Sequence, residues 1–311
     1  MPLNWSMEKQ RYHSFSSYLK DLFGKRVQRI PLDAGLGCPN RDKDLRGGCI
    51  YCDPYGSGTG RLHMGKSIKQ QMEEGIIWAQ KKYAAELFLA YFQSYTNTYA
   101  SIETLKRLYD EAVSFEGVVG LFVATRPDCI SNDVLDLISS YKDKYLVWIE
   151  LGLQSKHDKT LKFINRGHDF KTFDNAFNMI KKRQIPVCTH VIIGLPNESH
   201  DMIMETALYL SDIGTDGIKI HSLYVLNGTR LWEMYQRGSF KLMSQDEFVD
   251  LVVRILEILP PKTVIMRLTG DPPRHSDFEP KWAGYKHITI DKIKKRLEAI
   301  DTYQGKRWKN S

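Results

Sequence analysis

The sequence lacks any long apolar segment that could anchor it in a bilayer. No run of apolar residues approaches the ~20 residues that a membrane-crossing helix needs. The N-terminal stretch MPLNWSMEKQRYHSF also lacks the apolar region and the small-residue cleavage site of a secretory signal. We therefore expect a cytoplasmic protein without a membrane partner.

Internal repeats and low-complexity stretches are absent too, and no clear linker occurs before about residue 275. The 311 residues are 42% hydrophobic, which is enough for one domain of roughly 200 to 250 residues with small appendages. We expect an N-terminal extension over residues 1–24, a catalytic domain over 25–275 and a basic C-terminal extension over 276–311.

Cysteine is scarce, and its count of five is odd. A reducing cytosol disfavours structural disulfides, so these residues do not indicate a disulfide framework. Cys129 and Cys188 stand apart, and we expect both to be buried as small apolar groups. The other three lie within CPNRDKDLRGGCIYC, residues 38–52. Such crowding indicates metal binding or catalysis.

Positive charge is concentrated at the C-terminal end. Residues 281–311 contain nine Lys or Arg against three Asp or Glu, an excess of six in a net charge of +7. Cations with aromatic side chains among them suit the phosphates and unstacked bases of RNA, whereas no DNA partner is expected. A solvated amphipathic helix with a frayed tail has the same composition, so both interpretations stay open. The aromatic residues are Trp282, Tyr285, Tyr303 and Trp308.

Short apolar runs alternate with helical patterns along the chain, which predicts an α/β fold of repeated βα units with parallel strands. Such units build a closed or partial barrel, or an open doubly wound sheet. The predicted strands are 27–35, 85–93, 117–125, 145–154, 186–194, 217–225 and 263–269. The predicted helices are 67–83, 101–113, 131–141, 169–183, 199–212 and 244–259.

The alternation within the strand 145–154 separates a barrel from an open sheet. One face is apolar, while the other carries Trp148, Glu150, Gly152 and Gln154. Polar residues recur on one face of other strands, which favours an open-mouthed barrel with its site at the carboxyl ends of the strands. An unpartnered carboxylate in such a strand costs several kcal/mol, so we expect a ligand or a paired cation at Glu150.

The cysteine spacing indicates a metal centre. Ten residues separate Cys38 from Cys49, and two separate Cys49 from Cys52, so one tight loop offers three thiolates. Zinc with His63 as a fourth ligand and an iron–sulfur cube with one open iron are both compatible with this spacing. The loop follows the first predicted strand, where catalysis belongs in a βα barrel, and this position favours the cube.

Three cysteines after the first strand, with Tyr51 just before the last one, resemble the radical S-adenosylmethionine (SAM) superfamily. The common spacing there is three and then two residues, whereas the first gap here is ten, as in a subgroup similar to the radical SAM domain of the Elongator catalytic subunit. The stretches TRPD (125–128), ELGLQS (150–155), NRGH (165–168) and GLP (194–196) are similar to that subgroup's motifs. Over about residues 25–270 the chain looks like a member of the YhcC/YtqA family, also called MnmL.

The resemblance implies a partial (β/α)6 TIM-like barrel of the radical SAM type, with short terminal extensions. It also implies a [4Fe-4S] cluster held by Cys38, Cys49 and Cys52, which are therefore the catalytic and metal-binding residues. The cluster and SAM together generate a 5′-deoxyadenosyl radical, and an electron donor of the flavodoxin or ferredoxin type is expected. The family is associated with tRNA wobble uridine, in which a 5-carboxymethylaminomethyl group becomes 5-aminomethyl, so tRNA is the expected substrate.

The resemblance further implies which residues contact SAM. A carboxylate at Glu150 suits the ribose hydroxyls, and the bidentate guanidinium of Arg166 suits the SAM carboxylate. Where many family members carry Gly-Gly-Glu for the SAM amino group, this chain reads FQSYTNT. The other expected contacts are Tyr51 near the adenine, Gln93 with Thr96 for the amino group, and Gln154.

Five further polar residues of the predicted strands and their ends are candidates for substrate phosphate, carboxylate or base, without a ranking among them. Two other functions remain open: a radical SAM reaction on another small molecule or a protein, and a zinc-stabilised RNA-binding protein. The five candidates are His190, Lys219, His221, Arg267 and Asp271.

Overall fold

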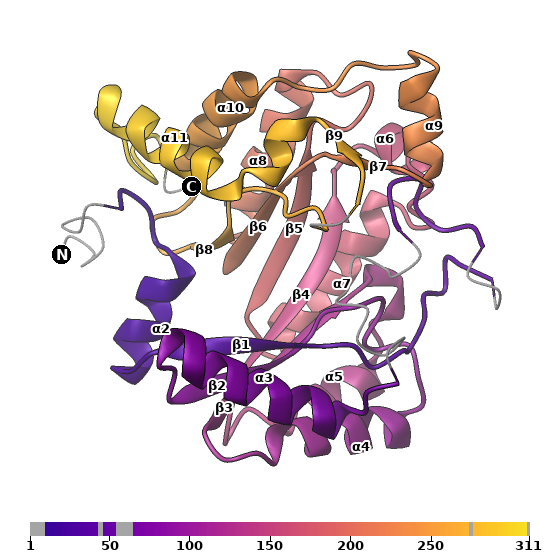
Figure 1. Cartoon of the computed structure of the whole chain (residues 1–311), viewed down its shortest axis with the longest axis vertical. Coiled ribbons are helices and arrows are strands. Elements are labelled where there is room, and N and C mark those ends of the chain that lie inside the picture. Colours follow the sequence, from indigo (N-terminus) through magenta and orange to yellow (C-terminus); the bar gives the residue numbers. More distant parts are fainter. Residues whose placement is uncertain (1–9, 43–45, 54–64, 274–275, 310–311) are drawn as a thin grey trace.

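The computed structural model describes residues 10–42, 46–53, 65–273 and 276–309 of the chain. Its central feature is a sheet of seven parallel strands that follow one another in sequence order (Figure 1). All seven were predicted from apolar runs. They are β1 (Val27–Leu32), β2 (Leu87–Phe92), β3 (Val118–Thr125), β4 (Leu146–Gln154), β5 (Val187–Ile193), β6 (Gly217–Ser222) and β8 (Val264–Arg267).

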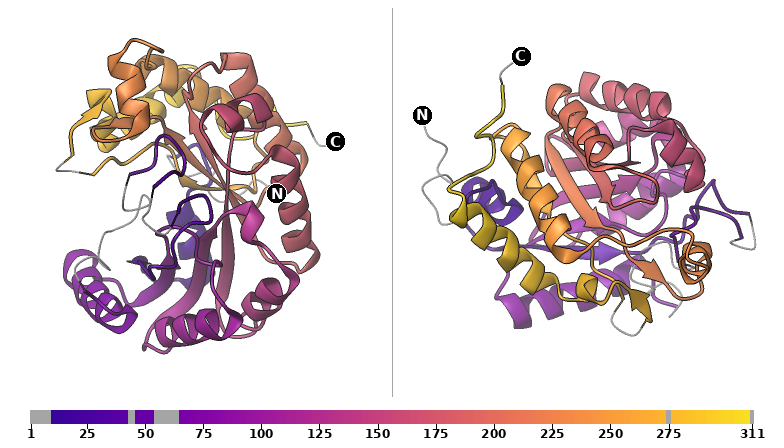
Figure 2. Two further views of the ribbon diagram at one scale, coloured as in Figure 1. Left: turned by 90° about the vertical axis from the view of Figure 1, so that its right-hand side faces the viewer. Right: turned by 90° about the horizontal axis from the view of Figure 1, so that it is seen from above.

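Helices cover the outer face of the curved sheet (Figure 2). Side-chain caps fix where they begin: Ser67 and Ser244 each complete a capping box with the residue three positions on. The connecting helices are α3 (Ile68–Tyr83), α4 (Ile102–Val113), α5 (Asn132–Ser139), α6 (Asp158–Phe163), α7 (Phe170–Lys182), α8 (His200–Asp212), α9 (Arg230–Gln236) and α10 (Gln245–Ile258), with the 3-10 turn η2 (Pro127–Cys129).

The sheet curls into a half-barrel whose edges remain apart. Among the described residues, β1 and β8 pair with β2 and β6 respectively and not with each other. Helix α2 (Phe15–Phe23) packs against both edge strands, and Ser14 forms a bridge with Ile265 of β8. Six βα units followed by a seventh strand confirm the predicted partial (β/α)6 barrel. The division into extensions and core stays a prediction.

Two apolar layers leave only one end of the barrel interior for a site. The outer layer lies between strands and helices and includes Ile149 and Leu151, which are fully buried. The inner layer fills the barrel near the amino ends of the strands, where Phe122 and Trp148 stack with ring centroids 6.1 Å apart. Phe15 of α2 packs edge-on against Phe122. The polar side chains that line the cavity therefore lie beyond this inner layer, toward the carboxyl ends of the strands.

The C-terminal segment is a packed helix, α11 (Lys286–Ala299), which follows the 3-10 turn η3 (Lys281–Gly284). Its buried Ile293 and Leu297 face the core beside α10. Several of its cations pair with acidic residues elsewhere, including Lys292 with Asp246 at 2.8 Å. The other pairs are Arg296 with Asp250, Lys286 with Asp271, and Arg307 of the following segment with Glu257.

Some details differ from expectation. Strand β2 ends at Phe92, so Gln93 lies just beyond it, and β6 ends at Ser222. Cys188 is fully buried as predicted, but Cys129 is only partly buried because η2 places it at the carboxyl edge of the sheet, beside a surface groove. The sequence did not indicate α2, α6, α9 or the short antiparallel pair β7 (Val225–Leu226) and β9 (Phe278–Glu279). No helix in the described ranges is both long and apolar enough to cross a membrane.

Candidate active site

The cysteine loop follows β1 and lies over the carboxyl ends of the strands. The turn between its last two cysteines is fixed by main-chain hydrogen bonds of Ile50, whose N–H donates to the Ile164 carbonyl at 3.0 Å and whose carbonyl accepts from the Leu231 N–H at 2.9 Å. The Cys52 N–H donates to the Cys49 carbonyl at 3.0 Å, which closes the two-residue turn. Two nearby thiols therefore sit on one anchored turn.

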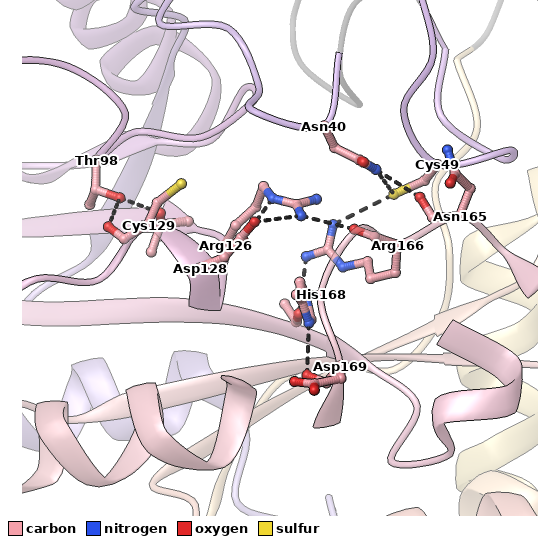
Figure 3. A network of polar contacts seen from close by, with 12 residues as sticks. Asn40, Cys49, Thr98, Arg126, Asp128, Cys129, Asn165, Arg166, His168 and Asp169 are labelled. Carbon is pink, nitrogen blue, oxygen red and sulfur yellow. Dashed lines mark hydrogen bonds and ion pairs between the residues drawn. The ribbon is translucent and has the colours of Figure 1, made fainter. Parts of the chain in front are cut away.

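The buried Cys49 sulfur receives donors from two residues outside its turn (Figure 3), and the Tyr51 hydroxyl of the turn also hydrogen-bonds it. The Asn40 amide lies 3.8 Å from Sγ and Arg166 Nη1 lies 3.6 Å from it. The same Asn40 amide donates to the Asn165 carbonyl at 2.7 Å, and the Asn165 amide donates to the Gly48 carbonyl at 2.7 Å. The NRGH segment thus anchors the cysteine loop through Asn165 and places the positive charge of Arg166 beside the Cys49 sulfur.

The two thiols of this turn differ in the direction of their pKa shifts. Burial by itself raises the pKa of Cys49, but the charge and hydrogen bond of Arg166 outweigh it and hold that pKa below its ordinary value. Burial raises the pKa of Cys52 to about 12. Arg166 therefore favours the thiolate at Cys49, the form that binds metal.

The TRPD motif orients Arg166 from the neighbouring strand end. The Arg126 guanidinium forms two 2.9 Å bonds to the Asp128 carboxylate and a third, also 2.9 Å, to the Arg166 carbonyl (Figure 3). Arg166 Nη2 donates to the Gly152 carbonyl at 3.0 Å. A Cβ at Gly152 would lie only 2.6 Å from that nitrogen, so a larger residue there would push the guanidinium aside.

One cavity of about 420 Å³ collects every residue predicted for the site. Its walls include the three cysteines of the loop and all six expected SAM contacts: Cys38, Cys49, Cys52, Tyr51, Gln93, Thr96, Glu150, Gln154, Arg166. The five unranked candidates line it as well: His190, Lys219, His221, Arg267, Asp271. The roles given to these residues remain predictions, while their grouping is observed.

A buried polar network forms the floor of the cavity. Glu150 Oε2 accepts from the Tyr91 hydroxyl at 2.8 Å, lies 2.9 Å from His190 Nε2 and pairs with the Lys219 ammonium. Lys219 also donates to the Tyr91 hydroxyl at 2.8 Å. Four strands contribute one side chain each: Tyr91 comes from β2, Glu150 from β4, His190 from β5 and Lys219 from β6. His190 and Lys219 are in register on neighbouring strands. The cation expected beside Glu150 is confirmed as Lys219.

The charges of this floor follow from burial and pairing. Burial alone would raise the pKa of Glu150, but the charge of Lys219 and the bond from His190 hold it well below its usual value. Burial lowers the pKa of Lys219 to about 8 and that of His190 to about 4. Near neutral pH, Glu150 and Lys219 are therefore an ion pair and His190 is uncharged.

Several polar atoms of the cavity wall have no partner within the described part of the chain. They are Glu150 Oε1, Thr96 Oγ1, Arg166 Nε and His221 Nε2, each buried from solvent. Buried polar atoms are normally satisfied, so acceptors and donors of this kind fit a polar ligand such as SAM. No group of three His, Cys, Asp or Glu in the described ranges converges on a single-ion site, and His63, the alternative zinc ligand, lies outside those ranges.

The backbone around the cavity contains three non-glycine residues in the left-handed region. Tyr95, Gln154 and Asn165 have φ of 59°, 73° and 52°. Such conformations cost of order 1 kcal/mol each and persist where surrounding contacts fix them, typically at functional sites. The bulge at Gly152 and Gln154 accompanies one of them and ends β4 beside the cavity. Neither these conformations nor the role of Asn40 could be read from the sequence motifs.

Comparison with known proteins adds an independent finding. The family model of the radical SAM superfamily matches residues 35–210, and that of the Radical_SAM C-terminal domain matches 215–299. YtqA of Bacillus subtilis is 39% identical over 306 residues, covering 98% of this chain and 95% of the relative. YhcC of Escherichia coli is 36% identical over 270 residues, covering 86% of each chain.

A solved structure has a similar fold. The archaeal Elp3 of Methanocaldococcus infernus superimposes with a TM-score of 0.65 at 22% identity, covering 79% of this chain and 62% of that one. The two arrangements share the half-barrel. This agrees with the resemblance that the sequence motifs suggested.

Proposed function

The chain belongs to the radical SAM superfamily, and we propose that it converts 5-carboxymethylaminomethyluridine at the wobble position of tRNA to 5-aminomethyluridine. One SAM would be cleaved to methionine and 5′-deoxyadenosine, the latter taking up a hydrogen atom of the carboxymethyl group, and water would release the two carbons of that group as glyoxylate. The superfamily fold implies a [4Fe-4S] cluster, SAM and an external electron donor. One observation carries the proposal: a single cavity joins a three-cysteine loop, unpartnered donors and acceptors, and a charged floor. The tRNA substrate rests on the similarity of the motifs to those of the YhcC/YtqA family.

The residues around the loop suit a bound cluster. Cys38, Cys49 and Cys52 would hold three irons and leave the fourth for SAM, and the bound pair would supply a 5′-deoxyadenosyl radical from a reduced cluster. Asn40 and Arg166 donate to the Cys49 sulfur, and such hydrogen bonds stabilise the more negative, reduced state of an iron–sulfur centre. The protein thereby favours electron uptake at this site.

The remaining polar atoms suit SAM itself. Within the described ranges Arg166 Nε has no hydrogen-bond partner and is available to the SAM carboxylate, while Thr96 Oγ1 near Gln93 is available to the amino group. Glu150 Oε1 can accept from a ribose hydroxyl, since Oε2 already receives the bonds from Tyr91, His190 and Lys219.

The basic C-terminal segment is a weaker support for tRNA binding than its composition suggests. Salt bridges to α10 and neighbouring loops engage several of its cations. An RNA contact on α11 would fall mainly to the exposed Lys295 and to Lys294 beside it. Both lie on the helix that packs against α10.

Nucleoside mass spectrometry of tRNA from a deletion strain tests the proposal. The account predicts that 5-carboxymethylaminomethyluridine accumulates and that its 5-aminomethyl product disappears, with recovery when the wild-type gene is restored and none with a Cys49→Ala gene. An unchanged wobble-uridine profile would remove tRNA as the substrate. Formation of 5′-deoxyadenosine by purified protein, measured separately, would then still support radical chemistry on a small molecule or a protein.

A further inference from the structure

The cavity wall formed by β6 and β8 contains a cation that the mechanism above leaves unused. Arg267 ends β8, is in register with Lys219, and its half-buried side chain lines the cavity. Among the described residues it forms no hydrogen bond or ion pair. His221, two residues beyond Lys219 on β6, lines the same cavity, and its buried Nε2 has no hydrogen-bond partner in the part of the chain that the structure describes. An arginine and an unsatisfied imidazole nitrogen therefore face the same space.

The charge balance of this wall leaves one positive charge uncompensated. Glu150 and Lys219 neutralise each other across the floor. Burial, with the charge of Arg267 as the next contribution, holds the pKa of His221 well below its usual value, so that this imidazole is neutral. Asp271 also lines the cavity, but its carboxylate bonds Lys286 at 3.0 Å.

The other cations near this wall each make contacts of their own within the described part of the chain. The Arg29 guanidinium on β1 lies over the rings of Phe15 and Tyr91, at 4.9 and 5.6 Å from their centroids, and does not contribute to the lining. Arg126 and Arg166 are held by Asp128, by carbonyls and by the Cys49 sulfur. Arg41, on the cysteine loop, also lines the cavity and donates to the Cys52 and Asp53 carbonyls. Among the described residues, Arg267 is thus the cation of the β6 and β8 wall whose guanidinium makes no hydrogen bond or ion pair with the protein.

We propose that Arg267, with His221 as a second contact, forms a subsite for a carboxylate of the substrate. A guanidinium binds a carboxylate through two parallel hydrogen bonds. A single positive charge among neutral imidazoles balances a monoanionic carboxylate better than a dianionic phosphate. The inference rests on the proposed function, because the substrate proposed there carries one carboxylate, on the group that is removed. Substrate held at Arg267 would share the cavity with the three cysteines.

Equilibrium binding of two nucleosides tests the subsite without turnover. The probes are 5-carboxymethylaminomethyluridine and its neutral carboxamide, titrated calorimetrically into anaerobic, cluster-loaded protein with SAM. Wild-type protein should bind the carboxylate about 10- to 100-fold more tightly than the carboxamide, the range expected for a charge-assisted pair. Arg267→Gln should reduce this ratio to near one, and Arg267→Lys should restore part of it. Arg254→Gln, an exposed arginine on α10, is the matched control and should keep the full ratio.

Each outcome decides the matter. Equal binding of both probes by wild-type protein, or a ratio that Arg267→Gln leaves intact, overturns the subsite, as does displacement of the carboxylate probe by equimolar inorganic phosphate. If Arg267→Gln fails to fold, as judged by circular dichroism, the double variant Arg267→Lys, His221→Phe replaces it. A full carboxylate-to-carboxamide affinity ratio in that double variant would also overturn the subsite. Failure of the proposed function would give a different pair of results. Wild-type protein would still bind the carboxylate more tightly than the carboxamide, but tRNA would yield no 5-aminomethyluridine.

Discussion

Replacing Lys219 by methionine isolates the contribution of the buried ion pair at the cavity floor. The Glu150 side chain is fully buried and that of Lys219 is 1% exposed. Lys219→Met keeps much of the side-chain volume but leaves the carboxylate, among the described residues, with the hydrogen bonds of His190 and Tyr91 and the more distant charge of Arg29. Removing one partner of a buried pair typically costs about 3–5 kcal/mol, because the remaining charge is desolvated. We expect a loss of that size in the free energy of unfolding at pH 7.

A double variant separates the charge from the packing. Glu150→Gln combined with Lys219→Met leaves no charge on the floor, and replacing both members of a buried pair is often near neutral. The double variant should therefore recover most of the stability that the single variant loses. Urea denaturation followed by fluorescence measures the free energy of unfolding of the wild type and both variants. The dependence of that free energy on urea concentration should be the same for all three proteins.

The pH dependence of the single variant provides a second test. In the wild type the pKa of Glu150 is depressed, so its contribution to stability is present above the unfolded pKa of about 4.3 and is lost as pH falls through the lower folded pKa. Without Lys219, burial raises the pKa of Glu150, and the folded variant then binds more protons than the unfolded chain. The loss caused by Lys219→Met should accordingly shrink as pH falls from 8 to 5.

Two results would refute this reasoning. A cost below about 1 kcal/mol at pH 7 would mean that water solvates the carboxylate, since an exposed pair contributes no more than that. A double variant as unstable as the single one would mean that lost packing, and not an uncompensated charge, causes the effect.

Further predictions concern the loop, the glycine and the tail. Cys49→Ala should abolish cluster loading and 5′-deoxyadenosine formation while the circular dichroism spectrum persists; retained product would contradict the ligand assignment. Asn40→Ala should lower the cluster's midpoint potential through loss of a hydrogen bond to sulfur, and an unchanged redox titration would rule this out. Gly152→Ala should displace the Arg166 guanidinium and weaken SAM binding at least tenfold, of order one lost charged hydrogen bond, with little change in melting temperature. Lys294→Gln with Lys295→Gln should reduce the salt slope of tRNA binding by about 2, or about 1 per phosphate contact; an unaltered slope would exclude α11 from the RNA interface.

Much of the barrel could be predicted because its signals are local. Apolar runs set the strands, and the alternation in β4 placed Glu150 and Gln154 on the interior face, where the structure has them. The partner of Glu150 could not be assigned in the same way. Lys219 lies 69 residues later, and only the register of β4, β5 and β6 brings the two together.

The hydrogen bonds that anchor the cysteine loop could not be predicted either, because they also join residues that are far apart in the sequence. Asn40 contacts Asn165 across 125 residues, and Arg126 contacts the Arg166 carbonyl across 40. The motifs containing Arg126 and Arg166 were recognised as similar to those of a family, but their mutual bonds depend on how neighbouring strand ends meet. Side-chain spacing along one strand contains no such information.

The C-terminal helix shows a signal that was present and not used. Asp246 and Asp250 are four residues apart on α10, and Lys292 and Arg296 have the same spacing on α11, so each pair occupies one helical face. Counting net charge emphasised the cations alone. Matching the two faces would have predicted that these helices pack together.

The central claim is that three cysteines on this half-barrel hold a [4Fe-4S] cluster with one iron left for SAM. Electron paramagnetic resonance of anaerobically reconstituted, dithionite-reduced protein tests it most directly, with and without SAM. We expect about four irons per chain, a reduced-cluster signal, and a change in that signal when SAM is added. Colourless protein that binds zinc and gives no signal would contradict it.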